Sequence, residues 1–139
     1  MNILVRRSGA LGDVVLTTPI VRRLKRENPN ANIDVLTAYP DVFRDNPCVD
    51  TAGPHVGCFD EPRSEHLGSY DRFIDLDGAY ERRPNLHIIS AYMQEAFGDA
   101  GDPFERQELF PGKLKTRLGP NAVAVHASMA GWSNRTLPR

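Results

Sequence analysis

The sequence has few of the features that mark secreted, metal-stapled or membrane-spanning proteins. Only two of its 139 residues are cysteines, Cys48 and Cys58, and no Cys-x-x-Cys pair is present. Their spacing argues against a structural metal site and predicts reduced thiols. No stretch approaches the roughly 18 apolar residues of a membrane span, and the N-terminal apolar run, Ile3 to Val5, is too short for a signal peptide. We therefore expect a cytoplasmic protein.

The chain also lacks an excess of either charge. Seventeen Lys and Arg residues face 18 Asp and Glu residues, which gives a formal net charge of −1. Proteins built to bind nucleic acid usually carry a strong basic excess, so we predict no nucleic-acid partner. A hydrophobic content of 40% with 25% charged residues is typical of a globular domain, and 139 residues suffice for one domain with a core but are few for two.

The glycine-rich turn of a dinucleotide-binding protein is missing too. The first expected strand, Ile3 to Val5, is followed by Gly9 and Gly12 in the spacing G-x-x-G. The second, Ile33 to Thr37, runs into Ala38 and Tyr39 without an acidic residue at its end. Enzymes that use NAD need G-x-G-x-x-G and that acidic residue. This pattern argues against NAD binding, and we predict no cofactor.

What is present predicts an α/β fold. The strands at 3–5 and 33–37, joined by a helix, form a parallel pair with a right-handed crossover. Apolar residues on that helix recur at helical spacing: Leu16, Ile20, Val21 and Leu24. Pro19 interrupts the pattern because it lacks an amide hydrogen and clashes one turn back. The helix therefore either begins near Thr18 or is kinked there.

The remaining elements follow from apolar periodicity and from the positions of proline and glycine. In chain order we expect a short helix at 41–46, a small third strand reached through 47–52, an exposed loop at 53–69, a strand at 70–78, a helix at 85–97 started by Pro84 and closed by Gly98, a linker at 112–121 and a strand at 122–127.

The turn after the first strand is the main candidate for a binding site. Gly9 and Gly12 can adopt positive φ and allow another molecule to approach the backbone, and the first amides of the next helix lack intrahelical partners. Asp13 is the one carboxylate of this turn. It either caps the helix or faces a substrate.

At these residues the sequence resembles the family 9 glycosyltransferases, the group that contains the lipopolysaccharide heptosyltransferases. The motif stands here as Arg7, Gly9-Ala10-Leu11-Gly12-Asp13-Val14 and Thr18-Pro19. The resemblance continues through Arg23, Leu24, Lys25, Pro29, the strand at 33–37, Asn46-Pro47 and Val49-Asp50. Gly9 stands where heptosyltransferases often carry Ser or Thr, which removes one hydroxyl contact to substrate.

The resemblance implies a GT-B architecture, in which two Rossmann-like domains face each other across a cleft. Residues 1–118 would form the N-terminal, acceptor-side domain, a parallel sheet flanked by helices, and 119–139 the start of a truncated donor-binding domain. We thus expect an N-terminal fragment or a truncated gene product. In the second part, Arg135 matches a basic residue that meets the donor diphosphate, and Ser128 or Ser133 supplies a hydroxyl.

The activity that the resemblance implies is inverting glycosyl transfer with Asp13 as general base. Gly9, Ala10, Leu11 and Gly12 would line the substrate pocket. The donor would be a nucleotide-diphosphate sugar, with ADP-heptose the best-known in the family, and the acceptor a lipopolysaccharide-type, lipid-linked or other anionic glycan. The alternative is a non-catalytic sugar- or nucleotide-binding fragment that lacks the donor domain.

Three side chains near the helix expected at 85–97 are further candidates. Arg82 and Arg83 suit an anionic acceptor, because guanidinium groups pair well with phosphate and carboxylate, or they are simply solvated. His87 lies one step off the apolar stripe of the helix. It either hydrogen-bonds an acceptor sugar or phosphate or is a surface or capping histidine.

Two charged patterns have competing interpretations. A basic cluster closes the first helix, made of Arg22, Arg23, Lys25 and Arg26. It is either a solvated helix end or a contact with anionic lipid at the inner face of the membrane. Asp75-Leu76-Asp77 has the D-x-D form of the metal motif of the GT-A fold, and both carboxylates share a face of a strand. We predict no metal, because the pattern is short and GT-B enzymes generally need none.

Overall fold

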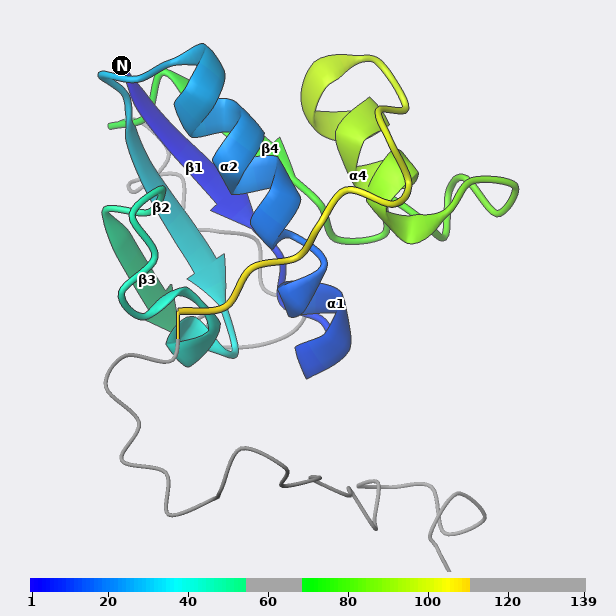
Figure 1. Cartoon of the computed structure of the whole chain (residues 1–139), viewed down its shortest axis with the longest axis horizontal. Coiled ribbons are helices and arrows are strands. Elements are labelled where there is room, and N and C mark those ends of the chain that lie inside the picture. The colour runs from blue at the N-terminus through cyan, green and yellow to red at the C-terminus, as the bar shows by residue number, and fades with distance from the viewer. Residues whose placement is uncertain (55–68, 111–139) are drawn as a thin grey trace, which may run out of the picture.

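The computed structural model describes residues 1–54 and 69–110 of the chain (Figure 1). In these residues one sheet has the strand order β3-β2-β1-β4, with every pairing parallel. Its strands are β1 (Asn2–Arg6), β2 (Asn32–Thr37), β3 (Thr51–Pro54) and β4 (Arg72–Asp75). The helices are α1 (Leu11–Val15), α2 (Thr18–Glu27) and α4 (Ile88–Phe97), with a short 3-10 helix, η1 (Pro40–Phe43). The predicted Rossmann-like α/β sheet is confirmed.

The break between α1 and α2 follows from Pro19. This residue lies in the first turn of α2, where a missing amide hydrogen is harmless. The carbonyl of Val15 would normally accept from the amide of residue 19, and instead it accepts from the Thr18 hydroxyl at 2.9 Å. The Thr17 hydroxyl bonds the Val14 carbonyl at 2.7 Å in the same way. Of the two predicted versions, the one with a new helix at Thr18 is correct.

The core lies between the sheet and the helices α2 and α4, which contact each other (Figure 1). Ile3 and Val5 are fully buried on this face of β1, and Ile20, Val21 and Leu24 of α2 are fully buried as well. From α4 the core receives Ile89, Tyr92, Met93 and Ala96. Of the apolar stripe predicted for the first helix, Ile20, Val21 and Leu24 are buried, whereas Leu16 precedes α2 and is only partly buried.

Helix α4 begins later than the sequence predicts. Three turn hydrogen bonds occupy the region before it, the last from the Leu86 amide to the Arg83 carbonyl at 3.0 Å. His87 is the N-cap, and its Nδ1 accepts from the Ile89 amide at 3.3 Å. At the other end Gly98 has a φ of 79°, a left-handed conformation that favours glycine, so the predicted closure is correct.

Other boundaries differ modestly. The helix expected at 41–46 is the 3-10 helix η1, and the strand expected at 70–78 pairs only over Arg72–Asp75. The linker at 112–121, the strand at 122–127 and the boundary near residue 118 lie outside the described residues, as does most of the loop expected at 53–69. Cys48 is a free thiol. No helix in the described part of the chain is long and apolar enough to cross a membrane.

Asp50 ties the segment before β3 to β2. Its Oδ2 accepts from the Ile33 amide at 2.8 Å, and its own amide donates to the Ile33 carbonyl at 2.8 Å. The hydrogen bond from the Ile33 amide lowers the pKa of the Asp50 carboxyl below its ordinary value. A lowered pKa means that the charged form stabilises the fold above the unfolded pKa of about 3.9, and that this contribution is lost as the pH falls.

We therefore expect Asp50→Asn to be less stable than the wild type at neutral pH and to approach it at acidic pH. Urea unfolding at about pH 7 and about pH 3, on either side of the unfolded carboxyl pKa, measures the difference. Asp41→Asn is the matched control, because that side chain is 80% exposed and, in the described part of the chain, its one ion pair is with the exposed Arg44. A stability difference for Asp50→Asn that stays the same at both pH values would contradict the assignment.

Candidate functional site

The candidate site lies where the sheet topology changes direction. From β1 the chain proceeds to β2 and then β3 on one side, and it returns to β4 on the other side of β1. The carboxyl ends of β1 and β4 therefore border the switch point, where open parallel sheets bind ligands. Arg7 and Ser8 follow β1 at this edge, and Leu76 and Asp77 follow β4.

Arg7 joins the two strands. Its amide donates to the Leu36 carbonyl of β2 at 3.0 Å. Its guanidinium donates through Nη1 to the Leu76 carbonyl at 3.2 Å and to Asp77 Oδ1 at 3.4 Å. Through Nη2 it donates to Asp13 Oδ2 at 2.8 Å. The carboxylate of Asp13 is thus held over the switch point by a cation anchored to the sheet.

Two tyrosines surround this cation. The guanidinium carbon of Arg7 lies 5.3 Å from the ring centroid of Tyr80 and 5.5 Å from that of Tyr92. Arg7 is only 4% exposed and Tyr92 is fully buried. Burial by itself lowers the pKa of Arg7, but the interactions with Tyr92, Asp13 and Asp77 raise it above its ordinary value. Burial also raises the pKa of the Tyr92 and Tyr80 phenols, so Arg7 is charged and both phenols are neutral at physiological pH.

Asp13 lies in the first turn of α1 but does not cap it. The N-cap position is Ala10, and no side chain makes a capping hydrogen bond there. The capping interpretation of Asp13 is therefore wrong. The carboxylate pairs with Arg7 through Oδ2, and its side chain is 21% exposed, so the group is reachable from solvent. α1 has only five residues, so its aligned peptide dipoles contribute little at the site.

The D-x-D carboxylates bind arginine and serine. Asp75 accepts from Arg6 Nε at 2.9 Å and also contacts Arg6 Nη2. Asp77 accepts from the Ser8 amide at 2.9 Å and from the Ser8 hydroxyl. These contacts occupy the oxygens that a divalent cation would need. No group of three or more His, Cys, Asp or Glu that could hold a metal occurs among the described residues.

The described cluster contains both charges. The guanidinium groups of Arg6 and Arg7 face the three carboxylates of Asp13, Asp75 and Asp77. Arg82 reaches the Asp77 carbonyl at the same edge, at 3.1 Å. Among the described residues the edge therefore has no clear excess of either charge.

The two glycines of the turn act differently from the prediction. Neither Gly9 nor Gly12 has positive φ. A Cβ on Gly9 would lie 2.4 Å from Arg7 Nη2, so glycine is needed here to give the guanidinium room. A Cβ on Gly12 would meet nothing within 4 Å, which leaves the surface beside Asp13 open. Leu11 is half exposed and lines an apolar pocket with Val15, Val42, Leu109 and Phe110.

Gly9→Ala should displace the Arg7 guanidinium without unfolding the protein. The new methyl group would overlap Nη2, and the arginine side chain must move because the backbone there is tied to the sheet. We expect thermal unfolding at a temperature only a few degrees below that of the wild type, about 1 kcal/mol of destabilisation, and an altered Arg7 Nε–H resonance by NMR. Gly53→Ala is the control, because no atom lies within 4 Å of its added Cβ. An unchanged Arg7 resonance in Gly9→Ala would show that the contact is not tight.

Arg82, Arg83 and His87 are engaged within the protein. Arg82 and Arg83 both donate to Glu95 Oε2 of α4, at 3.2 and 2.7 Å. Arg82 also bonds the Asp77 carbonyl at 3.1 Å and keeps 55% of its side chain exposed, against 29% for Arg83. His87 caps α4. Neither arginine is simply solvated, and of the three side chains Arg82 is the one placed next to Asp77.

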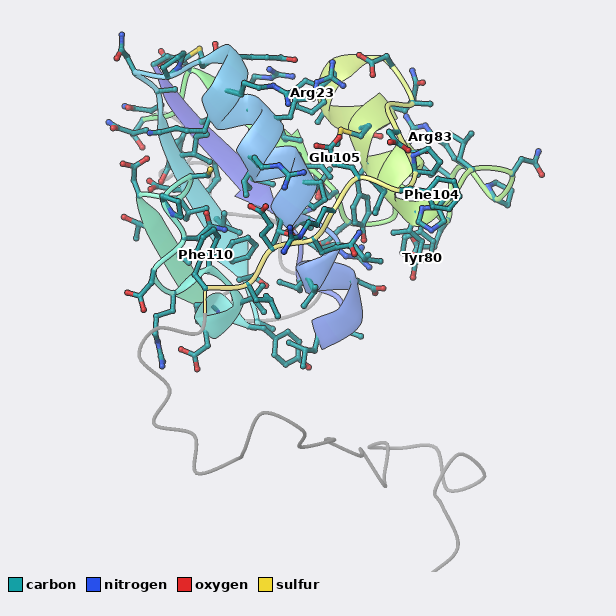
Figure 2. All side chains as sticks on the ribbon, in the orientation of Figure 1. Arg23, Tyr80, Arg83, Phe104, Glu105 and Phe110 are labelled. Atoms are coloured by element: carbon teal, nitrogen blue, oxygen red, sulfur yellow. The ribbon has the colours of Figure 1, made fainter. Side chains whose placement is uncertain are left out.

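The basic cluster at the end of α2 is largely neutralised. Arg22 pairs with Glu105 and Glu108, at 2.6 and 3.0 Å, on the segment that crosses α2 in Figures 1 and 2. Arg23 pairs with Glu27 and Asp99, each at 2.7 Å. Lys25 donates to the Ala31 carbonyl at 2.7 Å. Arg26, the fourth member of the cluster, is exposed. Three of the four cations therefore have partners within the protein, and contact with anionic lipid stays a prediction.

Ser128, Ser133 and Arg135 lie outside the described residues, so their predicted place at the donor diphosphate is not addressed by the structure.

Sequence reasoning missed the roles of Tyr80, Tyr92 and Ser8. Tyr92 stood on the apolar stripe of its helix, and nothing in local spacing distinguishes a core tyrosine from one that faces a buried arginine. The sequence marks Arg7 as a position of the motif but does not indicate what its side chain contacts.

Comparison with known proteins supports the fold. The described arrangement matches the crystal structure of a family 9 glycosyl transferase from Veillonella parvula with a TM-score of 0.56 and 20% sequence identity, over 78% of this chain and 44% of that one. The chain has the fold of part of a family 9 glycosyltransferase. A second structure, heptosyltransferase WaaC from E. coli with ADP-2-deoxy-2-fluoro heptose, aligns over 83% of this chain and 44% of its own, with 16% identity and a TM-score of 0.44.

The chain spans less than half the length of these two structures. No protein-family model and no curated protein matches it. At such low identity the match concerns the fold, and the chemistry has to be argued from the residues at the switch point.

Proposed function

We propose that this chain is the acceptor-side domain of an inverting glycosyltransferase in which Asp13 is the general base. In the proposed reaction, Asp13 takes the proton of an acceptor hydroxyl, and the oxygen attacks the anomeric carbon of the donor sugar. The bond from that carbon to the nucleotide diphosphate breaks on the opposite face, so the anomeric configuration inverts.

The observation that carries this proposal is the placement of the Asp13 carboxylate. It lies at the switch point of a parallel sheet, it is held by the buried Arg7 through Oδ2, and Oδ1 accepts no hydrogen bond from the described residues. A general base needs a reachable oxygen within hydrogen-bond distance of the proton it removes. The resemblance of the Arg7 to Pro19 motif to family 9 glycosyltransferases, and the shared fold, support the same assignment.

The ion pairs at the switch point favour the acceptor over the donor. Both Arg6 and Arg7 are already paired with carboxylates there, which leaves them unavailable to a nucleotide diphosphate. We propose that Arg135, with Ser128 or Ser133, meets the donor diphosphate. Gly12 and Leu11 would border the acceptor, and the exposed Arg82 would face an anionic group on it.

For the donor we propose a nucleotide-diphosphate sugar, with ADP-heptose as the first candidate from the sequence resemblance. The acceptor class that follows is a lipopolysaccharide-type or other anionic glycan.

The test is a transfer assay with the product examined by NMR. The chain is incubated with a panel of nucleotide-diphosphate sugars and a lipopolysaccharide core oligosaccharide, and the anomeric configuration of any new glycosidic bond is read from its coupling constants. We expect inversion relative to the donor. Retention would contradict Asp13 as a base acting on the acceptor, because retention needs a different sequence of steps.

The second candidate is a non-catalytic sugar- or nucleotide-binding domain. It is favoured by the contacts of Asp13, because the reachable carboxylate can accept a hydrogen bond from a sugar hydroxyl without removing its proton. Calorimetric binding of oligosaccharide without any transfer would support this candidate over catalysis.

A further inference from the structure

We propose that Arg7 is a positioning residue for Asp13, holding one carboxylate oxygen so that the other is presented to the acceptor hydroxyl. The inference rests on the proposed function and assigns a role to a residue that takes no direct part in the proton transfer.

The guanidinium of Arg7 is held from several directions. The backbone amide of Arg7 donates to β2, and Nη1 donates to the Leu76 carbonyl and to Asp77, just after β4. The rings of Tyr80 and Tyr92 lie 5.3 and 5.5 Å from its carbon, and Gly9 leaves the space that its Nη2 fills. A planar group held this way has little freedom to turn. The oxygen that it binds is therefore fixed relative to both strands.

The contact with Asp13 is one-sided. Nη2 reaches Oδ2 at 2.8 Å, and Oδ1 has no partner among the described residues. A bidentate pair would occupy both oxygens and leave none for a substrate. The one hydrogen bond from Arg7 holds the Asp13 carboxylate in place and leaves Oδ1 for the acceptor hydroxyl.

Two buried polar atoms around the Arg7 guanidinium do not contribute hydrogen bonds to the stability of the fold. Arg7 Nε and the Tyr92 hydroxyl are both buried and have no hydrogen-bond partner in the described part of the chain. Buried polar atoms without partners are rare in folded proteins, and phenylalanine in place of Tyr92 would remove one of them. An arrangement that keeps such groups beside a reachable carboxylate is typical of a functional site.

Arg7→Lys tests the inference, because lysine keeps the charge but loses the planar fork. Arg44→Lys is the matched control, since Arg44 is 67% exposed and its one ion pair within residues 1–54 and 69–110 is with Asp41. The first measurement needs no activity: scalar couplings across the Cα–Cβ bond of Asp13 report how many rotamers its side chain adopts. We expect one rotamer in the wild type and in Arg44→Lys, and averaging over several in Arg7→Lys. Several rotamers in the wild type, or one in Arg7→Lys, would overturn the inference.

The second measurement is kinetic. In Arg7→Lys we expect kcat to fall by about 10²-fold, the effect of a misplaced catalytic group, with KM for the acceptor changed by less than about threefold. An unchanged kcat would overturn the inference, whereas Arg44→Lys should match the wild type. If the wild type transfers no sugar from any donor, the proposed function fails, and the rotamer measurement still decides whether Arg7 positions Asp13.

Gly9→Ala provides a second route should Arg7→Lys not fold. It keeps the arginine but displaces Nη2, so the Asp13 side chain should again sample several rotamers. A single Asp13 rotamer in Gly9→Ala would count against the inference.

Discussion

Asp13→Asn is expected to lower the rate of glycosyl transfer by about 10²- to 10⁴-fold, the usual contribution of a general base. The amide is nearly the same size as the carboxylate, and its oxygen can still accept the hydrogen bond from Arg7 Nη2. It cannot take up a proton. Acceptor binding, followed by calorimetry, should therefore change little while turnover, followed by release of nucleotide diphosphate, is lost.

The matched control is Asp71→Asn. Asp71 is an exposed aspartate just before β4, at the amino edge of the sheet, where it accepts from the Asn2 amide at 2.7 Å. Turnover in this variant should equal that of the wild type. Full turnover in Asp13→Asn would remove the assignment of the base.

Leu24→Ala is expected to lower the free energy of unfolding by about 3 kcal/mol, within the range measured for buried leucines. Leu24 is fully buried, and it lies on the face of α2 that packs into the core between the sheet and the helices. Removing its isobutyl group leaves a cavity that close-packed neighbours fill only in part. Urea unfolding monitored by circular dichroism measures the loss.

Leu109→Ala is the comparison for this prediction. Leu109 is 55% exposed, so its truncation should change the free energy of unfolding by only about 0.5 kcal/mol. Equal losses in the two variants would contradict the packing of α2 described above.

The elements that local chemistry decides could be predicted from the sequence. Pro19 cannot continue a helix, and α2 does begin at Thr18. Gly98 ends α4 in the left-handed conformation, as its position after an apolar stripe predicts. The parallel pairing of β1 with β2 follows from one crossover helix between two short apolar runs.

The start of α4 shows where local reasoning fails. Pro84 is a good first helical residue, and yet the helix begins at Ile88. The preceding residues make turns instead, and the cap comes from the His87 ring, which hydrogen-bonds the Ile89 amide. Residues that can cap compete with residues that can start a helix, and propensity alone does not rank them.

Contacts between distant residues could not be predicted. Arg7 meets Asp77, 70 positions away, and Arg22 meets Glu105, 83 positions away. Spacing along the chain carries no information about such pairs. As a result, the sequence indicates Asp13 as the candidate base, whereas it does not indicate that Arg7 holds the Asp13 carboxylate.

A titration of the isotopically labelled chain, followed by NMR, most directly tests whether the switch point is an acceptor site. One series uses a lipopolysaccharide core oligosaccharide and the other uses ADP. We expect the oligosaccharide to shift the amide resonances of Ser8, Gly12 and Asp13, and ADP to leave these three unchanged, because both arginines at this edge are already paired with carboxylates. Shifts of these amides with ADP and none with the oligosaccharide would contradict the acceptor-side assignment and with it the role proposed for Asp13.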